Sequence, residues 1–490
     1  MFNHRALRTG GVALVAASLA ACAVGPDYKQ PEMPEVKTGS FTNLETTTFS
    51  AQEAQQRFWT QFNDATLDHL VNDALLANHD LRIALARFNE ARAARREARF
   101  DLAPTITASG GYTKQRFAQD QAGGSGALAG SREEELYDAG FDAAWELDLF
   151  GRVRRALEAR RAELQGAEAN LRDAQIIVIG EIARTYFELR GQQDRLAVAR
   201  RNVENQQSSL QLTSARLEAG TGTELDTSRA QAQLSTTLGS ISPLEAAVAR
   251  SIHRLSVLTG REPSALRDVL APTRELPPLP QIVAVGDPGA LLRRRPDIKV
   301  AERDLAAATA RIGVAIGDLF PKVTFTGNVG YVSADSGSLG DSGTDTYLIA
   351  PGISWAALDL GRVRAQIAGA RARNDAALAS YEQTVLRALE ETENALVTHA
   401  RSRDRLTHVT EAARASGTAA QLARVRYEGG MVDFLEVLDA ERSQLEAEDT
   451  LAQSRADTAT SLVAVYKALG GGWEDAPLPR YTPALTRTGK

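Results

Sequence analysis

Long stretches of this chain place apolar residues at helical spacing. From Asp64 to about Phe100 they follow a period of 3.6, which predicts one helix that ends before Pro104. From Arg152 to Glu218 the chain contains no proline and few glycines, and a helix of that length is on the order of 100 Å long at 1.5 Å per residue. No single globular core accommodates such a rod, so we expect it to pair with other helices as a coiled coil.

A shorter helical segment follows each long one. Glu224–Thr259 has helical spacing, and we expect an interruption near Ser242–Pro243 because proline removes a backbone donor. In the second half of the chain, a long helix runs to Glu428 and a last one runs from Phe434 to Leu469. The pattern therefore predicts two long helical hairpins, at about 152–259 and about 361–469.

The hydrophobic period changes from 3.6 to 2 between the helices. In Tyr137–Leu149 every odd position is apolar or alanine, and four of the six even positions are acidic. This alternation indicates a strand with one apolar and one acidic face. Thr105–Lys114 alternates more weakly, so we predict a β-hairpin at about 104–149 and, from a similar pattern, a second hairpin at about 321–357.

The second half of the chain repeats the first. Leu292–Ile298 aligns with Leu75–Leu81 at an offset of 217, and Trp355 aligns with Trp145 at an offset of 210. Internal repeats determine a fold, so they must be recognised first. We divide the chain into a first repeat at 64–260, a proline-rich connection at 261–288, a second repeat at 289–470 and a tail at 471–490.

The N-terminus carries an export pattern. Basic residues precede a short apolar core, and Leu19-Ala20-Ala21-Cys22 follows, with the only cysteine of the chain. A secretory signal peptide at 1–21 explains this arrangement. The four residues resemble the bacterial lipobox, in which the cysteine is acylated and becomes the first mature residue. Ala23 at the next position implies the outer membrane in known lipoproteins, and we interpret 22–63 as a lipid-anchored extended segment.

The predicted strands have the length and pattern of a membrane barrel. Strands of about 9–11 residues cross a bilayer when tilted, and an apolar face that alternates with a polar one is typical of the wall. A soluble β-sandwich shows the same alternation, but the export pattern favours the membrane. Four strands cannot close a barrel, so we expect three copies to form a 12-stranded one above an α-helical tube.

Composition and charge exclude several classes. A formal net charge of −6 gives no indication of nucleic-acid binding, and aromatic residues make up only 6%. The six histidines lack metal-ligand spacing, and we find neither a nucleophile elbow nor a phosphate loop. The sequence therefore predicts a protein that is not an enzyme and needs no cofactor or metal. A purely structural coiled-coil lipoprotein would explain the helices but not four amphipathic strands.

The turn between the last two helices has well-defined end signals. Gly429 and Gly430 can supply the positive φ that ends a helix. Asp433 suits the N-cap of the next helix, and Glu436 three residues later makes an approximate capping box. A weaker copy of this turn lies at 216–226.

These features together resemble the TolC-like outer-membrane efflux channels, and among them the NodT/OprM-like lipoproteins. The similarity covers essentially the whole mature chain. Its marks are the lipobox with Val24–Tyr28, the Leu-Arg-Arg-Arg-Pro-Asp-Ile run at 292–298, Trp145 and Trp355 with their Gly-Arg-Val-Arg runs, the tip at 429–440 and Tyr466–Trp473. The resemblance implies a homotrimer with a barrel in the outer membrane and a helical tunnel in the periplasm. It also implies a periplasmic adaptor and an inner-membrane transporter, commonly of the RND type, as partners in the export of drugs or other toxic compounds.

The resemblance also assigns site residues. The apolar and acidic rings of the family's periplasmic aperture fall on Leu435 and Asp439, which lie on one helix face. Glu436 aligns with a further acidic gate residue of some relatives, but it is equally a cap of Asp433. Where some relatives have a basic gate residue this chain has Val432. Adaptor docking is implied at the two tips, at Gly220, Thr221, Gly222 and Thr223 and at Gly430, Met431, Val432 and Asp433.

The cargo stays open at this point. The same channel could serve a drug efflux pump, a type I protein secretion system or a metal efflux system. Three methionines and one cysteine provide no soft-metal relay, although a channel needs none.

Overall fold

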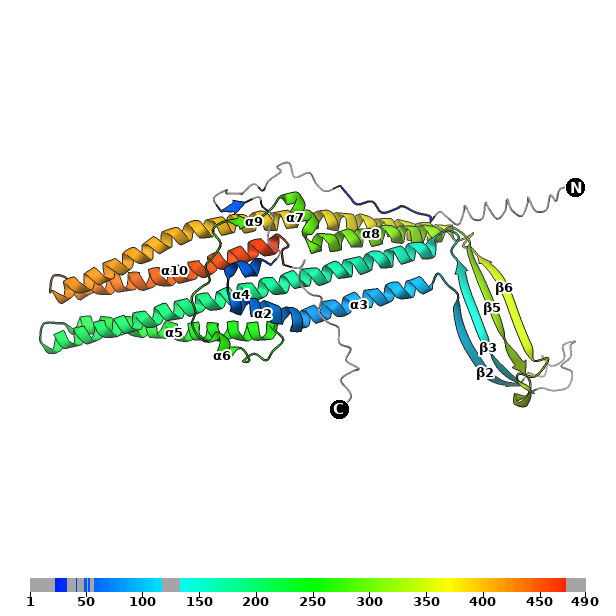
Figure 1. Cartoon of the computed structure of the whole chain (residues 1–490), viewed down its shortest axis with the longest axis horizontal. Coiled ribbons are helices and arrows are strands. Elements are labelled where there is room, and N and C mark those ends of the chain that lie inside the picture. The colour runs from blue at the N-terminus through cyan, green and yellow to red at the C-terminus, as the bar shows by residue number, and fades with distance from the viewer. Residues whose placement is uncertain are drawn as a thin grey trace. The chain divides into compact units, whose positions relative to one another are not determined.

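The computed structural model describes residues 23–32, 41, 48–50, 52, 57–116 and 133–472 (Figure 1). The signal peptide, Cys22, the whole loop between the first two long strands (117–132) and nearly all of the tail lie outside these residues. Within the described part, no helix combines the length and the apolar character needed to cross a membrane.

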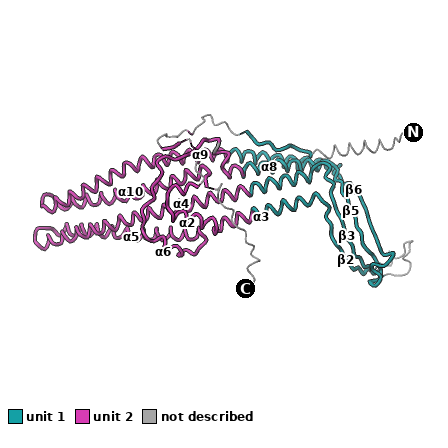
Figure 2. Tube along the Cα trace, viewed as in Figure 1, with its two compact units in different colours: residues 1–32, 88–167, 300–382 teal, residues 33–87, 168–299, 383–490 magenta. Residues whose placement is uncertain are grey.

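The chain forms two compact units, coloured separately in Figure 2. Each unit combines segments of both sequence repeats, so the units are not the repeats themselves. The first consists of Met1–Glu32, Phe88–Ala167 and Val300–Glu382, and the second of Met33–Arg87, Glu168–Lys299 and Gln383–Lys490.

The first unit contains a four-stranded antiparallel sheet. Its strands are ordered β2-β3-β5-β6, so β2 and β6 are the edges. Strands β2 and β5 begin 217 positions apart and have equal length, which shows the duplication in the structure. The bounds are β2 Thr105–Arg116, β3 Glu133–Leu147, β5 Lys322–Ser333 and β6 Asp345–Ser354.

The register of the sheet separates an apolar face from a polar face. Asp142 is paired with Thr107 on one side and Asn328 on the other, so these three residues share the polar face. Phe141 is paired with Ala108 and Val329 on the other face. The large apolar residues of that face, including Ile106, Tyr112, Phe141, Val329, Tyr347, Ile349 and Ile353, are exposed in the single chain. The sheet thus has an apolar surface that the described residues do not cover.

Two tryptophans join the sheet to the helices in the same way in both repeats. The Trp145 Nε1–H donates to the Leu102 carbonyl at 3.2 Å, and the Trp355 Nε1–H donates to the Leu319 carbonyl at 3.0 Å. The two acceptors close the turns that follow α3 His79–Phe100 and α8 Pro296–Gly317. The paired tryptophans therefore fix the helix-side end of each β-hairpin.

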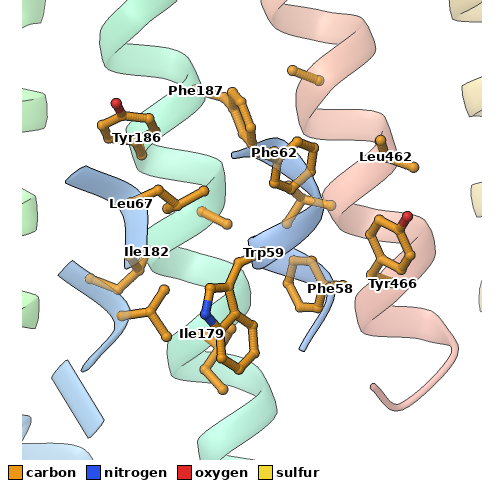
Figure 3. Packing of buried hydrophobic residues seen from close by; sticks show 14 of the residues in the cluster. Phe58, Trp59, Phe62, Leu67, Ile179, Ile182, Tyr186, Phe187, Leu462 and Tyr466 are labelled. Carbon is orange, nitrogen blue, oxygen red and sulfur yellow. The ribbon is translucent and has the colours of Figure 1, made fainter. Parts of the chain in front are cut away.

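The second unit has a dense aromatic core around the 3₁₀ helix η1 Phe58–Phe62 (Figure 3). Phe58 stacks on Tyr466 with ring centroids 4.9 Å apart, and Phe62 meets Phe187 edge-on at 4.8 Å. Burial of such side chains contributes roughly 1.5–3 kcal/mol each. This core joins several helices, among them α4 Arg152–Glu218, α10 Phe434–Ala468 and α2 Ala65–Ala77.

The single helix expected from Asp64 to Phe100 is wrong, because it breaks at Asn78 into α2 and α3. The Asn78 backbone is extended, with φ −61° and ψ 133°. Its side-chain oxygen accepts from the N–H groups of Asp80 and Leu81, so it caps α3. Its amide nitrogen donates to the Leu258 carbonyl at 2.8 Å. One buried asparagine therefore starts a helix and satisfies the end of another.

Arg295 occupies the equivalent position in the second repeat, 217 residues later. It separates α7 Pro288–Arg294 from α8, and its Nη1–H donates to the Ala468 carbonyl at 2.7 Å. Ala468 lies 210 positions after Leu258, the acceptor of Asn78. Both repeats therefore tie a helix break to the end of the return helix, with a different residue in each.

The interruption expected at Ser242–Pro243 is also wrong. Helix α5 runs from Glu224 to Leu258 with Pro243 inside it. The carbonyl left without its usual donor belongs to Gly239, four residues earlier. Gly239 is exposed, so water can satisfy that oxygen and the helix continues.

The remaining described elements are short, apart from α9. Strand β1 Phe49–Ser50 pairs in parallel with β4 Val283–Ala284 in the second unit. The proline-rich connection also contains α6 Arg267–Leu270, and η2 Ser336–Ser338 lies between β5 and β6. The long helix α9 spans Leu360–Glu428.

Candidate functional site

Two hairpin turns in the second unit form the candidate site, which we call the first tip (residues 216–226) and the second tip (residues 426–439). Gly220 and Gly430 have φ of 68° and 70°, the left-handed conformation that favours glycine. The N–H of each donates to the carbonyl three residues before it, at 3.0 Å in both turns. The next N–H donates to the carbonyl five residues before it, at 2.9 Å in both. This is the Schellman arrangement, which satisfies the carbonyls at a helix end.

The two tips differ in how the second helix begins. At the first tip the Asp226 N–H donates to Thr223 Oγ1 at 3.2 Å, a true N-cap. At the second tip Asp433 stands at the N-cap position, but its side chain accepts no hydrogen bond from the described backbone of α10. The capping box expected for Asp433 and Glu436 is therefore wrong, because Asp433 provides no side-chain cap. Glu436 is exposed, and Asp433 forms no side-chain cap that it could complete. A capping role therefore does not compete with a role of Glu436 in the gate.

The first turns of α10 have a buried and an exposed face. Phe434 and Val437 are buried and pack with Tyr427 and Ala230 in a small apolar cluster. Leu435 is 51% exposed on the other side, so it does not pack inside its own hairpin.

Asp439 lies on the exposed side as well. It accepts a hydrogen bond from Arg442 Nη2 at 2.6 Å. The sequence prediction included Leu435 and Asp439 but did not include Arg442. The exposed face therefore carries a carboxylate with a cation three residues after it.

Arg216 joins the two tips, and our sequence interpretation missed it. Its Nη2 group donates to the Tyr427 carbonyl at 2.8 Å and to the Glu428 carbonyl at 3.0 Å, the last carbonyls of α9. Its guanidinium carbon also lies 4.2 Å from the centre of the Tyr427 ring. A cation at a helix C-terminus and over an aromatic face is stabilised twice. The only sequence signal is an arginine at the same place of both tips, at 216 and 426.

A buried charge pair holds α9 and α10 against α4 above the tips. Arg424 Nη2 donates to Glu441 Oε1 at 2.6 Å, and Ser209 Oγ of α4 donates to the same oxygen at 2.7 Å. The Glu441 side chain is 5% exposed. Further along, Arg195 makes a bidentate contact with Asp449 at 2.7 and 3.0 Å. The hairpin of α9 and α10 is thus tied to α4 at successive levels.

A polar cluster elsewhere in the second unit surrounds a cavity of about 200 Å³. Arg295 donates to Asp297 at 2.8 Å and to Glu391 at 2.7 Å. Burial, and next to it the charge of Asp297, raises the pKa of Asp173 to about 6, although Arg295 and Lys467 act in the opposite direction.

We expect Asp173→Asn to stabilise the protein at pH 7.5 and to change its pH dependence. Between pH 4 and 6 the folded protein holds a proton on Asp173 that the unfolded chain, with a pKa of 3.8, has lost. This group therefore makes the free energy of unfolding fall as the pH rises through that window. The variant loses that fall and gains on the order of 1–3 kcal/mol at pH 7.5. Thermal unfolding of wild type, variant and the exposed control Asp268→Asn from pH 4.5 to 7.5 measures this, and equal curves would contradict it.

Comparison with known proteins identifies the chain. The sequence model of the family described as Outer membrane efflux protein matches residues 70–261 and 288–471, which cover both repeats. The chain belongs to the outer membrane efflux protein family. Within it, the toluene efflux pump outer membrane protein TtgC of Pseudomonas putida is 32% identical over 468 residues, 94% of this chain and 95% of that protein. The cation efflux system protein CusC of Escherichia coli is 29% identical over 465 residues, 94% of this chain and 98% of that one.

The fold of this family agrees with the structure. The solved outer-membrane channel OprN matches with a TM-score of 0.85 and 43% identity over 93% of this chain and 100% of that one. The predicted fold class, long helical hairpins with a barrel part, is confirmed by this similarity. The chain is an outer-membrane channel protein of an efflux system. Among the described residues, no cluster of three or more His, Cys, Asp or Glu side chains could hold a metal ion.

Proposed function

We propose that this outer membrane efflux protein works as a homotrimer, as the exit duct of a tripartite system with a periplasmic adaptor and an RND-type inner-membrane transporter. It would pass drugs or other toxic small molecules outward and catalyse no reaction. The observation that carries the proposal is the four-stranded sheet, whose apolar face is exposed and whose two edge strands are unpaired among the described residues. Unpaired backbone groups are not tolerated in lipid, so edges of this kind require partner strands from other copies.

The second tip is the proposed gate. Leu435 and Asp439 are exposed on one face of α10 and face away from the cluster that packs the hairpin. Around a threefold axis they would form an apolar ring and an acidic ring, with Glu436 nearby. Three carboxylates at a constriction concentrate negative potential and favour cations.

We expect Asp439→Ala to raise the single-channel conductance of the trimer in planar bilayers and to lower its preference for cations. The replacement removes the carboxylate of the acidic ring and leaves Arg442 without its 2.6 Å partner. The matched control is Asp226→Ala, which removes an acid from the first tip. Unchanged conductance and reversal potential in Asp439→Ala would contradict the gate.

Adaptor docking is proposed at both tips. The exposed positions are Gly220, Thr221 and Thr223 at the first tip and Gly430, Met431 and Asp433 at the second, with Gly222 and Val432 partly buried. Site-specific cross-linking from Thr221 and Met431 to the co-expressed adaptor tests this. Cross-links that appear only from positions far from the tips would contradict it.

We also propose that Cys22 is acylated and anchors the chain in the outer membrane. Its position after Leu19-Ala20-Ala21 supports this. Mass spectrometry of the mature N-terminus is the test, and an unmodified cysteine or an intact signal peptide would contradict it.

The cargo is tested by deletion. CusC is described as part of a cation efflux system and TtgC as part of a toluene pump, so relatives of this chain handle different cargoes. We expect a deletion strain to become sensitive to drugs or solvents. Sensitivity to metal ions alone would favour the metal system, and loss of a secreted protein would favour type I secretion.

A further inference from the structure

The described residues that follow Cys22 are held against α4 and α8 in the first unit. We call Ala23–Tyr28 the strap. The Arg155 side chain, 5% exposed, donates to the Val24 carbonyl at 3.1 Å, to the Gly25 carbonyl at 3.2 Å and to Asp27 Oδ1 at 2.7 Å. In addition, the Val24 N–H donates to the Phe150 carbonyl at 3.0 Å. Charge-assisted hydrogen bonds from a buried arginine are strong, so this is a specific seat for the strap.

Two glycines allow the strap to lie against the helices. Gly25 has φ of 97°, and a Cβ atom there would lie 2.5 Å from Gly313 Cα in α8. Gly151 has φ of 80°, and a Cβ atom there would lie 2.5 Å from Ala23 Cα. A larger residue at either position would displace the strap, because no side chain fits between these backbones.

Tyr28 fixes the other end of the strap. Its hydroxyl donates to Glu302 Oε1 at 2.8 Å, and the Arg303 guanidinium carbon lies 5.2 Å from the centre of its ring. The ring packs beside a small cluster of buried alanines, Ala162, Ala306 and Ala307. The strap is therefore held at both ends and in the middle.

The internal repeat provides a natural comparison, because the seat is built only once. At offset 210, Arg155 corresponds to Ala365. At offset 217, Glu302 corresponds to Leu85 and Gly313 to Arg96. Gly361, the counterpart of Gly151, has no described atom within 4 Å of the place where a Cβ would stand. The residues that contact the strap therefore have no counterparts of the same kind or environment at the equivalent positions of the repeat.

We propose that Arg155 is a positioning residue for the lipid anchor: by seating the strap, it determines where the acyl chains on residue 22 enter the membrane. This rests on the acylation of Cys22 proposed above. Residue 22 is covalently bonded to Ala23, so the position of Ala23 limits where the acyl chains can begin. Ala23 lies against Gly151, four residues after the end of β3. The strap therefore fixes Ala23, the neighbour of the acylated residue, beside the helix-side end of β3.

The test uses a palmitate analogue with a diazirine close to its carboxyl end, fed to cells that express the full chain. After illumination of intact membranes, the cross-linked peptides are located by mass spectrometry. In wild type we expect cross-links concentrated on the peptide that ends at Arg152. In Arg155→Ala we expect the amount of cross-link on that peptide to fall at least fivefold, with the total label on Cys22 unchanged.

Gly25→Val is the second variant, because it displaces the strap without changing a helix, and the same drop is expected. Arg160→Ala, an exposed position of the same helix, is the matched control and should behave like wild type. An unchanged cross-link pattern in both Arg155→Ala and Gly25→Val would overturn the positioning role. Absence of label on Cys22 would instead overturn the proposed acylation on which this inference rests.

Discussion

Replacement of Arg295 by alanine is expected to destabilise the second unit by about 1.5–3 kcal/mol, because this buried guanidinium makes charge-assisted hydrogen bonds. The variant removes the 2.7 Å donor of the Ala468 carbonyl, and Asp297 and Glu391, which both line the cavity, lose the cation that they share. It also removes a cation that lowers the pKa of Asp173. Thermal unfolding of the purified protein at pH 7.5 measures the loss as a lower transition temperature.

Two variants make this prediction specific. Arg293→Ala removes an exposed arginine from the same Arg-Arg-Arg run and should change stability by less than about 0.5 kcal/mol. Asn78→Ala removes the equivalent contact of the first repeat, the bond to the Leu258 carbonyl, and leaves no charge unpaired. It should lower the free energy of unfolding by about 1–2 kcal/mol. If the Arg295→Ala and Arg293→Ala variants unfold at the same temperature, the contacts of Arg295 do not stabilise the second unit.

Replacement of Arg216 by alanine is expected to open the gate that we propose at the second tip. Arg216 is bonded to the last two carbonyls of α9 and lies over the Tyr427 ring, so its loss frees the second tip from the first. Hydrogen bonds that involve a charged group contribute about 1.5–3 kcal/mol, and each 1.4 kcal/mol shifts an opening equilibrium about tenfold. We expect at least a tenfold rise in the open probability of single channels in planar bilayers.

Arg426→Ala is the matched control for this change. Arg426 occupies the same place at the second tip, 210 positions later, but its side chain is exposed. It should leave the open probability near that of wild type. An equal rise in both variants would mean that loss of positive charge, rather than release of the tip, changes the channel.

The long helices and the strands could be predicted from the sequence because nothing competes with their periodicity. The rod from Arg152 to Glu218 has the same bounds in the structure as in the sequence interpretation. The first strand begins at the predicted Thr105. In such segments each residue repeats the same indication, so a single deviation changes little. The offsets of 217 and 210 then relate the two halves.

The helix breaks and the contact between the two tips could not be predicted, because each depends on one polar residue and a partner far away in the chain. Asn78, at which one helix ends and the next begins, also bonds to Leu258, which lies 180 positions later. Pro243 fails to break one because Gly239 is exposed. Arg216 donates to the Tyr427 carbonyl at the end of α9, 211 positions later. Local propensity contains no information about any of these contacts.

The order of the strands also has a consequence for assembly. Neighbours in the sheet are antiparallel throughout, so β2 and β6 run in opposite directions. When identical copies join head to tail, β6 of one therefore meets β2 of the next as another antiparallel pair, and the alternation of up and down strands continues across every seam. An odd number of strands per chain would force a parallel seam between copies. Because each chain has four strands, the product of one duplicated hairpin, a ring of any number of copies can close with every pair of neighbouring strands antiparallel.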